Sequence, residues 1–258
     1  MKRTIALGNI EVARIGLGTN RLRNVDDHVA FIRAAVDAGI QMIDTAHLYT
    51  GGESEKTIGR ALSPAPQGVV VATKGGYGSA GRGKPDVLAR EIEQSLASLR
   101  IERIALYYLH RVDPETPIEE SLGAIKECVD RGVIDQVGIS KVDIPLIERA
   151  RKVVRIAAVQ NEYNVSKRSS DDVVDYCARE GIVFVPYYPL GADAGRAVRE
   201  TAKRHRATPQ QVMLAWLLKR SPAMLPIPGT LSPRHLRDNL GALSLELSDK
   251  EFDEIADD

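Results

Sequence analysis

The chain has 258 residues, and its 35 Lys and Arg balance 35 Asp and Glu, so the formal net charge is zero. This balance argues against nucleic-acid and membrane-surface partners. Residues 1–12 lack the apolar stretch of a signal peptide, and no apolar run is long enough to span a bilayer. The two cysteines are too few for a disulfide framework. We therefore expect a cytoplasmic globule, with one domain over residues 1–258.

The chain opens with a predicted hairpin and then alternates between strand-like and helix-like segments. Residues 4–7 and 10–13 flank Gly8-Asn9, a pair suited to a two-residue turn. Runs rich in β-branched residues follow at 13–16, 41–44, 69–74, 104–110, 136–140, 157–160, 182–187 and 224–228. Helix-like segments occupy 25–38, 54–62, 85–99, 118–131, 145–153, 170–180, 197–220 and 233–239. The pairs Thr208-Pro209 and Ser232-Pro233 have the form of helix starts.

This alternation predicts an α/β fold of eight strand–helix units closed into a (β/α)8 TIM barrel, with the N-terminal hairpin capping the barrel bottom. An open doubly wound sheet is the alternative. That fold would place a G-x-G-x-x-G turn after its first strand. The stretch from Gly16 to Arg21 breaks the pattern, and no helix follows it at once.

Three of the predicted strands end in an ionisable residue, and these residues suit one reaction. The residues are Asp44, Lys74 and His110, and Tyr49 lies five positions after Asp44. Parallel barrel strands would bring them to one rim, where barrel enzymes keep their chemistry. Lys74, held by Asp44, would lower the pKa of a Tyr49 phenol, and His110 would bind the same substrate oxygen. Such a set can protonate a carbonyl oxygen during reduction, with a nicotinamide cofactor as hydride source.

Each residue also has a simpler interpretation. Asp44 could cap a turn, Lys74 could be an exposed lysine, and His110 and Tyr49 could be ordinary rim side chains. Asp44, His47 and His110 are also metal-ligand types, but no H-x-H or H-E-x-x-H spacing accompanies them, and we expect no metal. No G-x-S-x-G elbow supports a nucleophilic triad. Each simple explanation is plausible for one residue alone, but it is much less plausible that all four hold at the same rim.

The segments that carry these four residues resemble the aldo-keto reductases. Residues 42–62, MIDTAHLYTGGESEKTIGRAL, are similar to the family's Asp-Thr-Ala-x-x-Tyr signature and the helix after it. VVVATKGG, residues 69–76, and LYYLHRVDP, residues 106–114, are similar to the segments holding its lysine and histidine. The resemblance implies a (β/α)8 barrel that interconverts carbonyls and alcohols with NAD(P)H. It also implies that Tyr49 is the general acid, tuned by Lys74, while Asp44 holds Lys74 and His110 orients the carbonyl.

The same resemblance implies a nicotinamide site. Ser140 matches the start of a Ser-Asn pair that binds the carboxamide, although Lys141 stands where the family has Asn. Lysine can donate to a carboxamide oxygen but cannot accept from its NH2 group. Gln160 matches a second carboxamide ligand, and Tyr187 matches the aromatic that stacks on the ring. Further cofactor positions are expected at Gly18, Thr19, Asp44, Leu190 and Gly191.

The segment PIPGTLSPRHLRDNL, residues 226–240, resembles the family's adenosine-phosphate site. The helix predicted to start at Ser232-Pro233 would offer backbone N–H groups to phosphate. The residues expected at this end of the cofactor are Gly229, Thr230, Arg234, His235, Asp238 and Asn239. His235 stands where the family has an Arg for the 2′-phosphate, and Arg234 is next to it. NADPH is the first choice of cofactor, and NADH is possible.

The motifs VQNEYN, VPYYPLG and IPGT resemble a compact bacterial branch that includes pyridoxal reductase-like enzymes. This resemblance points to a small-molecule carbonyl substrate, with aromatic aldehydes such as pyridoxal as candidates. The protein is expected to be a monomer or a weak homo-oligomer. The alternative function is a cofactor-binding redox sensor on the same fold, as in channel-associated subunits that also carry a basic residue after the serine. The short loop 192–195 and the complete set of four favour an enzyme.

Overall fold

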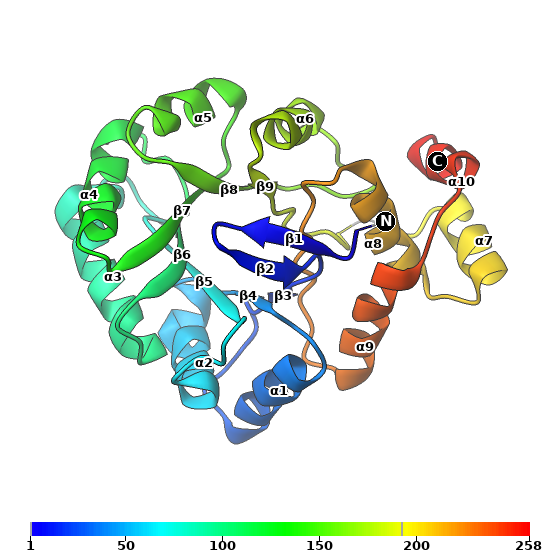
Figure 1. The fold of residues 1–258 in the computed structure, drawn as a ribbon, viewed down its shortest axis with the longest axis horizontal. Coiled ribbons are helices and arrows are strands. Elements are labelled where there is room, and N and C mark those ends of the chain that lie inside the picture. Colours follow the sequence, from blue (N-terminus) through cyan, green and yellow to red (C-terminus); the bar gives the residue numbers. More distant parts are fainter. Residues whose placement is uncertain (1, 192) are drawn as a thin grey trace.

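The computed structural model describes residues 2–191 and 193–258. Its centre is a curled sheet of seven parallel strands, each paired with the next one along the chain (Figure 1). The strands are β3 (Leu17–Gly18), β4 (Met42–Asp44), β5 (Val70–Gly75), β6 (Ile104–Leu109), β7 (Ile134–Ser140), β8 (Ile156–Gln160) and β9 (Val183–Phe184). Sequential parallel order places every strand's carboxyl end at one rim of the sheet.

An extended segment, residues 224–229, fills the eighth position and closes the barrel. It forms parallel bridges with Phe184 of β9 and with Gly18 of β3. Pro226 and Pro228 accept hydrogen bonds from the backbone N–H groups of residues 16 and 18, at 3.0 and 3.3 Å. Proline has no N–H of its own, so this segment cannot form a complete ladder and is not a regular strand. The closed barrel confirms the (β/α)8 prediction.

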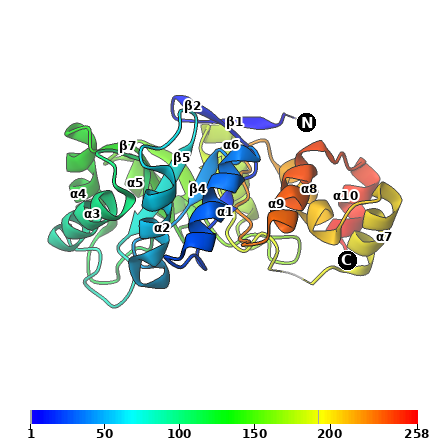
Figure 2. The same ribbon diagram turned by 90° about the horizontal axis from the view of Figure 1, so that it is seen from below.

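Helices surround the sheet. They are α1 (Asp26–Asp37), α2 (Glu53–Leu62), α3 (Pro85–Leu99), α4 (Ile118–Asp130), α5 (Ile144–Arg151), α6 (Asp171–Glu180), α7 (Arg196–His205), α8 (Pro209–Arg220), α9 (Pro233–Gly241) and α10 (Asp249–Ala256). Two 3-10 turns, η1 (Tyr49–Gly52) and η2 (Ala242–Ser244), complete the described elements. Figures 1 and 2 show α7 and α10 side by side, outside the ring of helices that covers the strands. No helix in the described ranges is long and apolar enough to cross a membrane.

The predicted single helix 197–220 is wrong, because the chain breaks it into α7 and α8. Arg206 adopts a left-handed conformation with φ 51°, which ends α7. Thr208 then starts α8 with a capping box: its hydroxyl accepts from the Gln211 N–H, and the Gln211 side chain accepts from the Thr208 N–H. This cap satisfies two N–H groups at the helix start, so the chain begins a new helix here instead of continuing α7.

The first barrel strand begins later than predicted, at Leu17 instead of residue 13. The reason is Arg14, whose side chain is buried. Its guanidinium donates to the carbonyls of Leu218 and Met224 at 3.0 and 3.1 Å. The residues after the hairpin therefore satisfy the end of α8 before the chain enters the sheet.

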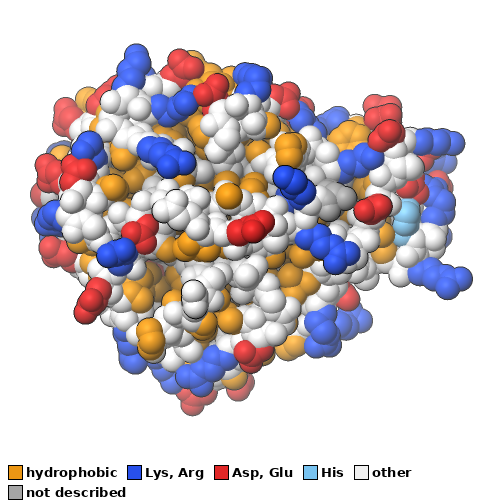
Figure 3. Space-filling model, in the orientation of Figure 1, with side chains coloured by type: hydrophobic (Ala, Val, Ile, Leu, Met, Phe, Trp, Pro, Cys, Tyr) orange, Lys and Arg blue, Asp and Glu red, His pale blue; other side chains and the backbone are white. Residues whose placement is uncertain are grey.

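The N-terminal hairpin covers the amino end of the barrel. Its strands, β1 (Thr4–Leu7) and β2 (Ile10–Ala13), pair antiparallel, and the turn residue Gly8 has φ 61°. Leu7 and Val12 are buried among apolar side chains of the barrel interior. Figure 2 shows the hairpin lying across one end of the strands, as predicted. The surface around it carries interspersed positive and negative side chains (Figure 3), in keeping with the zero net charge.

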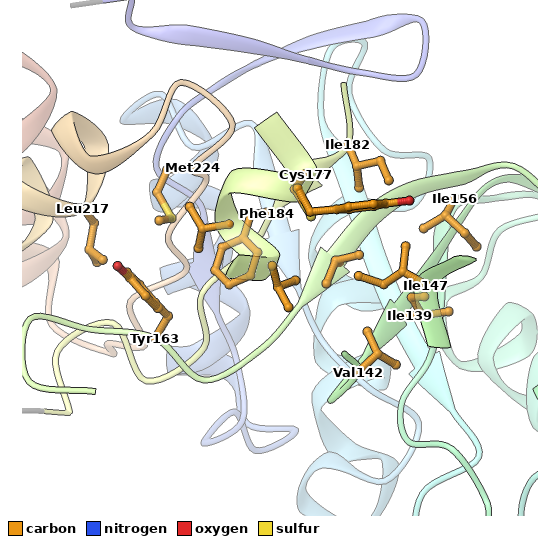
Figure 4. Packing of buried hydrophobic residues seen from close by; sticks show 14 of the residues in the cluster. Ile139, Val142, Ile147, Ile156, Tyr163, Cys177, Ile182, Phe184, Leu217 and Met224 are labelled. Atoms are coloured by element: carbon orange, nitrogen blue, oxygen red, sulfur yellow. The ribbon is translucent and has the colours of Figure 1, made fainter. Parts of the chain in front are cut away.

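The largest core lies between the sheet and the helices on one side of the barrel. Figure 4 shows part of it, where Phe184 lies between Tyr163 and Cys177. The Tyr163 ring meets Phe184 edge to face, with centroids 5.8 Å apart. Close packing of this kind holds side chains in single positions. The carboxyl ends of these packed strands, at the rim away from the hairpin, are therefore fixed supports for a site.

Candidate active site

A buried ion pair lies at the carboxyl rim. Asp44 ends β4 and Lys74 lies on the neighbouring strand β5, so both side chains reach the same place. The Lys74 Nζ donates to Asp44 Oδ1 at 2.5 Å and to the Thr45 carbonyl at 2.6 Å. The exposed fractions of Lys74 and Asp44 are 0% and 1%. Two buried charges that satisfy each other in this way are held rigidly.

Tyr49 and His110 complete the cluster. Tyr49 begins η1, a tight turn whose next residue Thr50 has φ 49°. The Lys74 Nζ lies 5.0 Å from the centre of the Tyr49 ring. His110 directly follows β6, and its ring centre is 5.9 Å from that of Tyr49 in an edge-to-face arrangement. The four residues predicted to share one site do lie together.

The protonation states suit an acid beside a fixed cation. Burial lowers the pKa of Lys74, but the charges of Asp44 and Tyr49 outweigh it and leave that pKa above its ordinary value. Burial raises the pKa of the Tyr49 phenol; Lys74 lowers it, but not enough to offset burial and Asp44. Burial, then the charges of Lys74 and Lys141, lower the pKa of His110 to about 2. Near neutral pH, the cluster thus has a charged lysine, a neutral phenol and a neutral imidazole.

The second oxygen of Asp44 is also bound. Gln160, at the end of β8, donates from Nε2 to Asp44 Oδ2 at 2.9 Å. The backbone of Asp44 is held from the other side, since Thr19 Oγ1 donates to the Asp44 carbonyl at 2.8 Å. The carbonyl oxygen of Gln160 takes no part in this bond and can accept from another partner. Gln160 therefore belongs to the ion-pair network, and its contact with a cofactor stays a prediction.

The cluster opens into a hollow of about 420 Å³. Its lining residues are Gly18, Thr19, Asn20, Arg21, Asp44, Leu48, Tyr49, Tyr77, His110, Ser140, Lys141, Gln160, Tyr187, Tyr188, Pro189, Leu190, Gly191, Ile227, Pro228 and Gly229. A second hollow of about 360 Å³ extends toward the start of α9 and includes Thr230, Ser232 and His235. Residues 18–21 and Gly229 line both, so the two form one elongated groove.

The predicted cofactor residues fall into three groups. All those from Gly18 to Gly191, and Gly229, line the first hollow; Thr230 and His235 line the second. Arg234, Asp238 and Asn239 line neither of them. Arg234 is exposed to solvent, whereas Asn239 is buried. The predicted short loop 192–195 includes Ala192, which lies outside the described residues.

Several lining residues escaped the sequence analysis. They are Asn20, Arg21, Leu48, Tyr188, Pro189, Ile227 and Pro228. Most are chain neighbours of predicted residues, and that adjacency is the signal that could have found them. Tyr188 is different: it is 60% exposed and adopts a left-handed φ of 51°, which no sequence pattern indicates for tyrosine.

The floor of the groove requires glycine at one point. A Cβ atom on Gly18 would lie 2.8 Å from the carbonyl oxygen of Ile227 in the closing segment. Beyond it, α9 begins with Ser232 as its cap, whose Oγ accepts from the His235 N–H at 3.4 Å. A helix start presents N–H groups and the positive end of the helix dipole, and this combination attracts anions.

Comparison with known proteins gives one consistent result. The Aldo/keto reductase family matches residues 14–257. Pyridoxine 4-dehydrogenase of Escherichia coli (strain K12) is 34% identical over 274 residues, which span 96% of this chain and 95% of that protein. A thermostable aldo-keto reductase solved with the inhibitor epalrestat has a TM-score of 0.90 and 31% identity, over 98% of both chains.

A third comparison comes from Klebsiella pneumoniae. Its aldo/keto reductase, solved with NADP and acetate, has a TM-score of 0.88 and 28% identity, over 99% of this chain and 94% of that one. The resemblance first seen in the motifs thus extends over nearly the whole chain. On this evidence the chain belongs to the aldo/keto reductase family of oxidoreductases.

Proposed function

We propose that the protein reduces aldehydes and ketones to alcohols with NADPH, and that Tyr49 delivers the proton. The observation that carries this proposal is the buried Asp44–Lys74 pair beside the Tyr49 ring, in a groove long enough to continue to α9. A structural ion pair would need no phenol beside it and no open groove above it. This combination suits transfer of a proton to a substrate oxygen.

Each of the four side chains has a separate role in the proposed reduction. The neutral His110 imidazole has one N–H that can donate to a carbonyl oxygen and set its direction. The phenol of Tyr49 is protonated near neutral pH, so it has a proton to give as negative charge develops on that oxygen. Lys74 stabilises the phenolate that remains, and Asp44 keeps Lys74 charged and in place. The nicotinamide, when bound, supplies the hydride.

The groove fits such a cofactor. Near the cluster, Tyr187 offers a partly exposed aromatic face, and Gln160 has hydrogen-bonding capacity left for an amide. At the far end, the start of α9 suits phosphate groups. The Klebsiella relative was solved with NADP, and this supports NADPH as the cofactor. Arg234, exposed on the first turn of α9, is the proposed contact for a 2′-phosphate.

We also propose aromatic aldehydes, with pyridoxal as one candidate, as substrates. Tyr77, Tyr187 and Tyr188 line the groove, and the Tyr77 ring lies 4.8 Å from His110. An aromatic wall beside the carbonyl position favours a substrate with a flat aromatic ring. The similarity to pyridoxine 4-dehydrogenase supports the same class. The cytoplasmic location, the single domain and the monomeric or weakly oligomeric state remain predictions. Limited proteolysis tests the single domain, and size-exclusion chromatography tests the oligomeric state.

The test is oxidation of NADPH, followed at 340 nm, with pyridoxal and with a nitrobenzaldehyde, repeated with NADH. The matched variant is Tyr49→Phe, which keeps the ring and removes the proton donor. Turnover by the wild type, lost in the variant with NADPH binding kept, is the expected result. Tight cofactor binding without turnover would instead favour a redox sensor. Absence of any cofactor binding would overturn the proposal.

A further inference from the structure

One cation at the mouth of the groove is not used by the proposed chemistry. Lys141 follows Ser140 at the end of β7, and its side chain is exposed. Its Nζ lies 4.5 Å from the centre of the Tyr77 ring and 5.9 Å from that of Tyr187. Tyr77 in turn lies against His110, with ring centres 4.8 Å apart. A single aromatic ring therefore separates the ammonium group from His110.

The backbone fixes this direction. Lys141 has a left-handed φ of 60°, which is uncommon for a residue other than Gly, Asn or Asp. Its N–H donates to the Gln160 carbonyl at 3.0 Å. The next residue, Val142, is held at both its N–H and its carbonyl by the side chain of Asn161, at 3.0 and 2.7 Å. A left-handed residue fixed on both sides is the kind of strain that functional sites retain.

The ammonium of Lys141 has no carboxylate partner among the described residues. Gln160, whose carbonyl accepts the Lys141 N–H, is followed two residues later by Glu162. The Glu162 carboxylate is already paired with Lys167, at 3.2 Å. Of the described residues that line the first hollow, Asp44 alone is acidic, and Lys74 already neutralises it. Lys141 also contributes to the lowered pKa of His110, so its field reaches the place where a carbonyl would bind. The mouth of the groove thus carries an unneutralised positive charge.

We propose that Lys141 selects carbonyl substrates that carry a carboxylate or phosphate one aromatic ring away from the carbonyl. This inference rests on the proposed reductase function and names the substrate class of that site. The Tyr77 and Tyr187 rings hold the ammonium by cation–π contact until an anion replaces them. Lys141 is therefore a specificity residue on the substrate side, whereas the sequence motif assigned it to the cofactor carboxamide.

The test compares 4-formylbenzoate with its methyl ester, two aldehydes of similar shape that differ in one charge. The measured quantity is the ratio of their kcat/KM values with NADPH. In Lys141→Gly, which removes the cation, suits the left-handed backbone and does not introduce the family's carboxamide-binding Asn, this ratio should fall about fivefold, the scale of a partly solvated ion pair. The drop should appear mainly in KM. Lys141→Arg keeps the charge and should hold the ratio within about twofold of the wild type.

A matched control removes a different cation from the same groove. Arg21 lines both hollows, on the side that leads to α9. Arg21→Met should leave the ratio of the two aldehydes unchanged, whatever its effect on NADPH affinity. Added salt should lower the wild-type ratio, because an exposed ion pair is screened.

Two results would overturn the inference. If Lys141→Gly loses activity equally on both aldehydes and binds NADPH more weakly, Lys141 serves the cofactor. If the ratio stays constant, Lys141 has no part in selection. Failure of the wild type to reduce either aldehyde would instead remove the reductase function on which the inference depends. The Kd of NADPH, measured by fluorescence for each variant, separates these cases.

Discussion

The two ends of the groove are built by different means. At the chemical end, Asp44 and Lys74 lie on adjacent strands, are buried, and are joined at 2.5 Å. At the far end, Arg234 is exposed on a helix start whose cap bond to the His235 N–H is 3.4 Å long. Buried groups on paired strands have one arrangement, whereas exposed side chains have many. The first end is therefore set by the fold, and the second depends on its ligand.

Breaking the buried pair should produce the largest effect. Lys74→Met leaves the Asp44 carboxylate buried without its cation, and we expect a loss of about 3–5 kcal/mol in the free energy of unfolding, as well as loss of turnover. Urea denaturation measures the first quantity. The double variant Asp44→Asn, Lys74→Met should recover part of that stability but none of the turnover. Equal stability of Lys74→Met and the wild type would mean that the pair is not buried in solution.

Tyr49 should dominate the rate at that same end. Tyr49→Phe is expected to lower kcat for carbonyl reduction about 10²–10⁴-fold. In the wild type, reduction requires the protonated phenol, so the rate should fall as pH rises through the pKa of Tyr49. Because burial raises that pKa, the fall should begin only in strongly alkaline solution. A pH–rate profile with a basic limb near neutrality would assign the proton transfer to another group.

At the far end, effects should be smaller and confined to the cofactor. Arg234→Ala should raise the KM for NADPH about fivefold and leave the KM for NADH unchanged, because only NADPH carries the 2′-phosphate. Arg90→Ala is the matched control: Arg90 is exposed on α3 and pairs with Asp86 at 2.9 Å. An equal change with both cofactors would place Arg234 away from the 2′-phosphate.

The smallest effect is expected at the α9 cap. Ser232→Ala should destabilise the protein by less than the ~1 kcal/mol typical of a helix cap, since its bond to His235 is long. Thr208→Ala offers the comparison. Thr208 takes part in a reciprocal capping box, with bonds of 3.2 and 2.8 Å to Gln211, and its loss should cost more. Thermal unfolding of the two variants should reveal this order, and the reverse order would refute it.

The contrast between the buried end and the exposed end of the groove also explains which parts of the site the sequence could predict. Asp44 ends β4, Lys74 lies one residue before the end of β5 and His110 directly follows β6, and strand order alone brings strand ends together. The partner of a side chain is less readable: Gln160 was expected at the cofactor, yet it also binds Asp44. The spacing of residues in the sequence does not indicate which of two partners the Gln160 amide will bind.

Competition between local signals accounts for the other errors. In segment 197–220, the absence of glycine allows one long helix, while Thr208-Pro209 favours a new start. The cap wins because it satisfies helix-end N–H groups that would otherwise need water. The barrel's closing segment shows the converse, since its β-like pattern contains two prolines that prevent a regular ladder. Both outcomes depend on hydrogen-bond accounting, which hydrophobic periodicity does not include.

The closing segment, residues 224–229, has a consequence for biosynthesis. The four residues proposed for catalysis are complete once the ribosome has passed His110, but the groove needs Gly229 beside Gly18. Arg14 likewise cannot form its hydrogen bond to the Met224 carbonyl until that residue, 210 positions later, has been synthesised. Contacts so distant in the chain form slowly, because a long loop must close first. Between the synthesis of residue 110 and that of residue 229, a nascent chain therefore has its reactive side chains but no closed barrel and no groove for a cofactor.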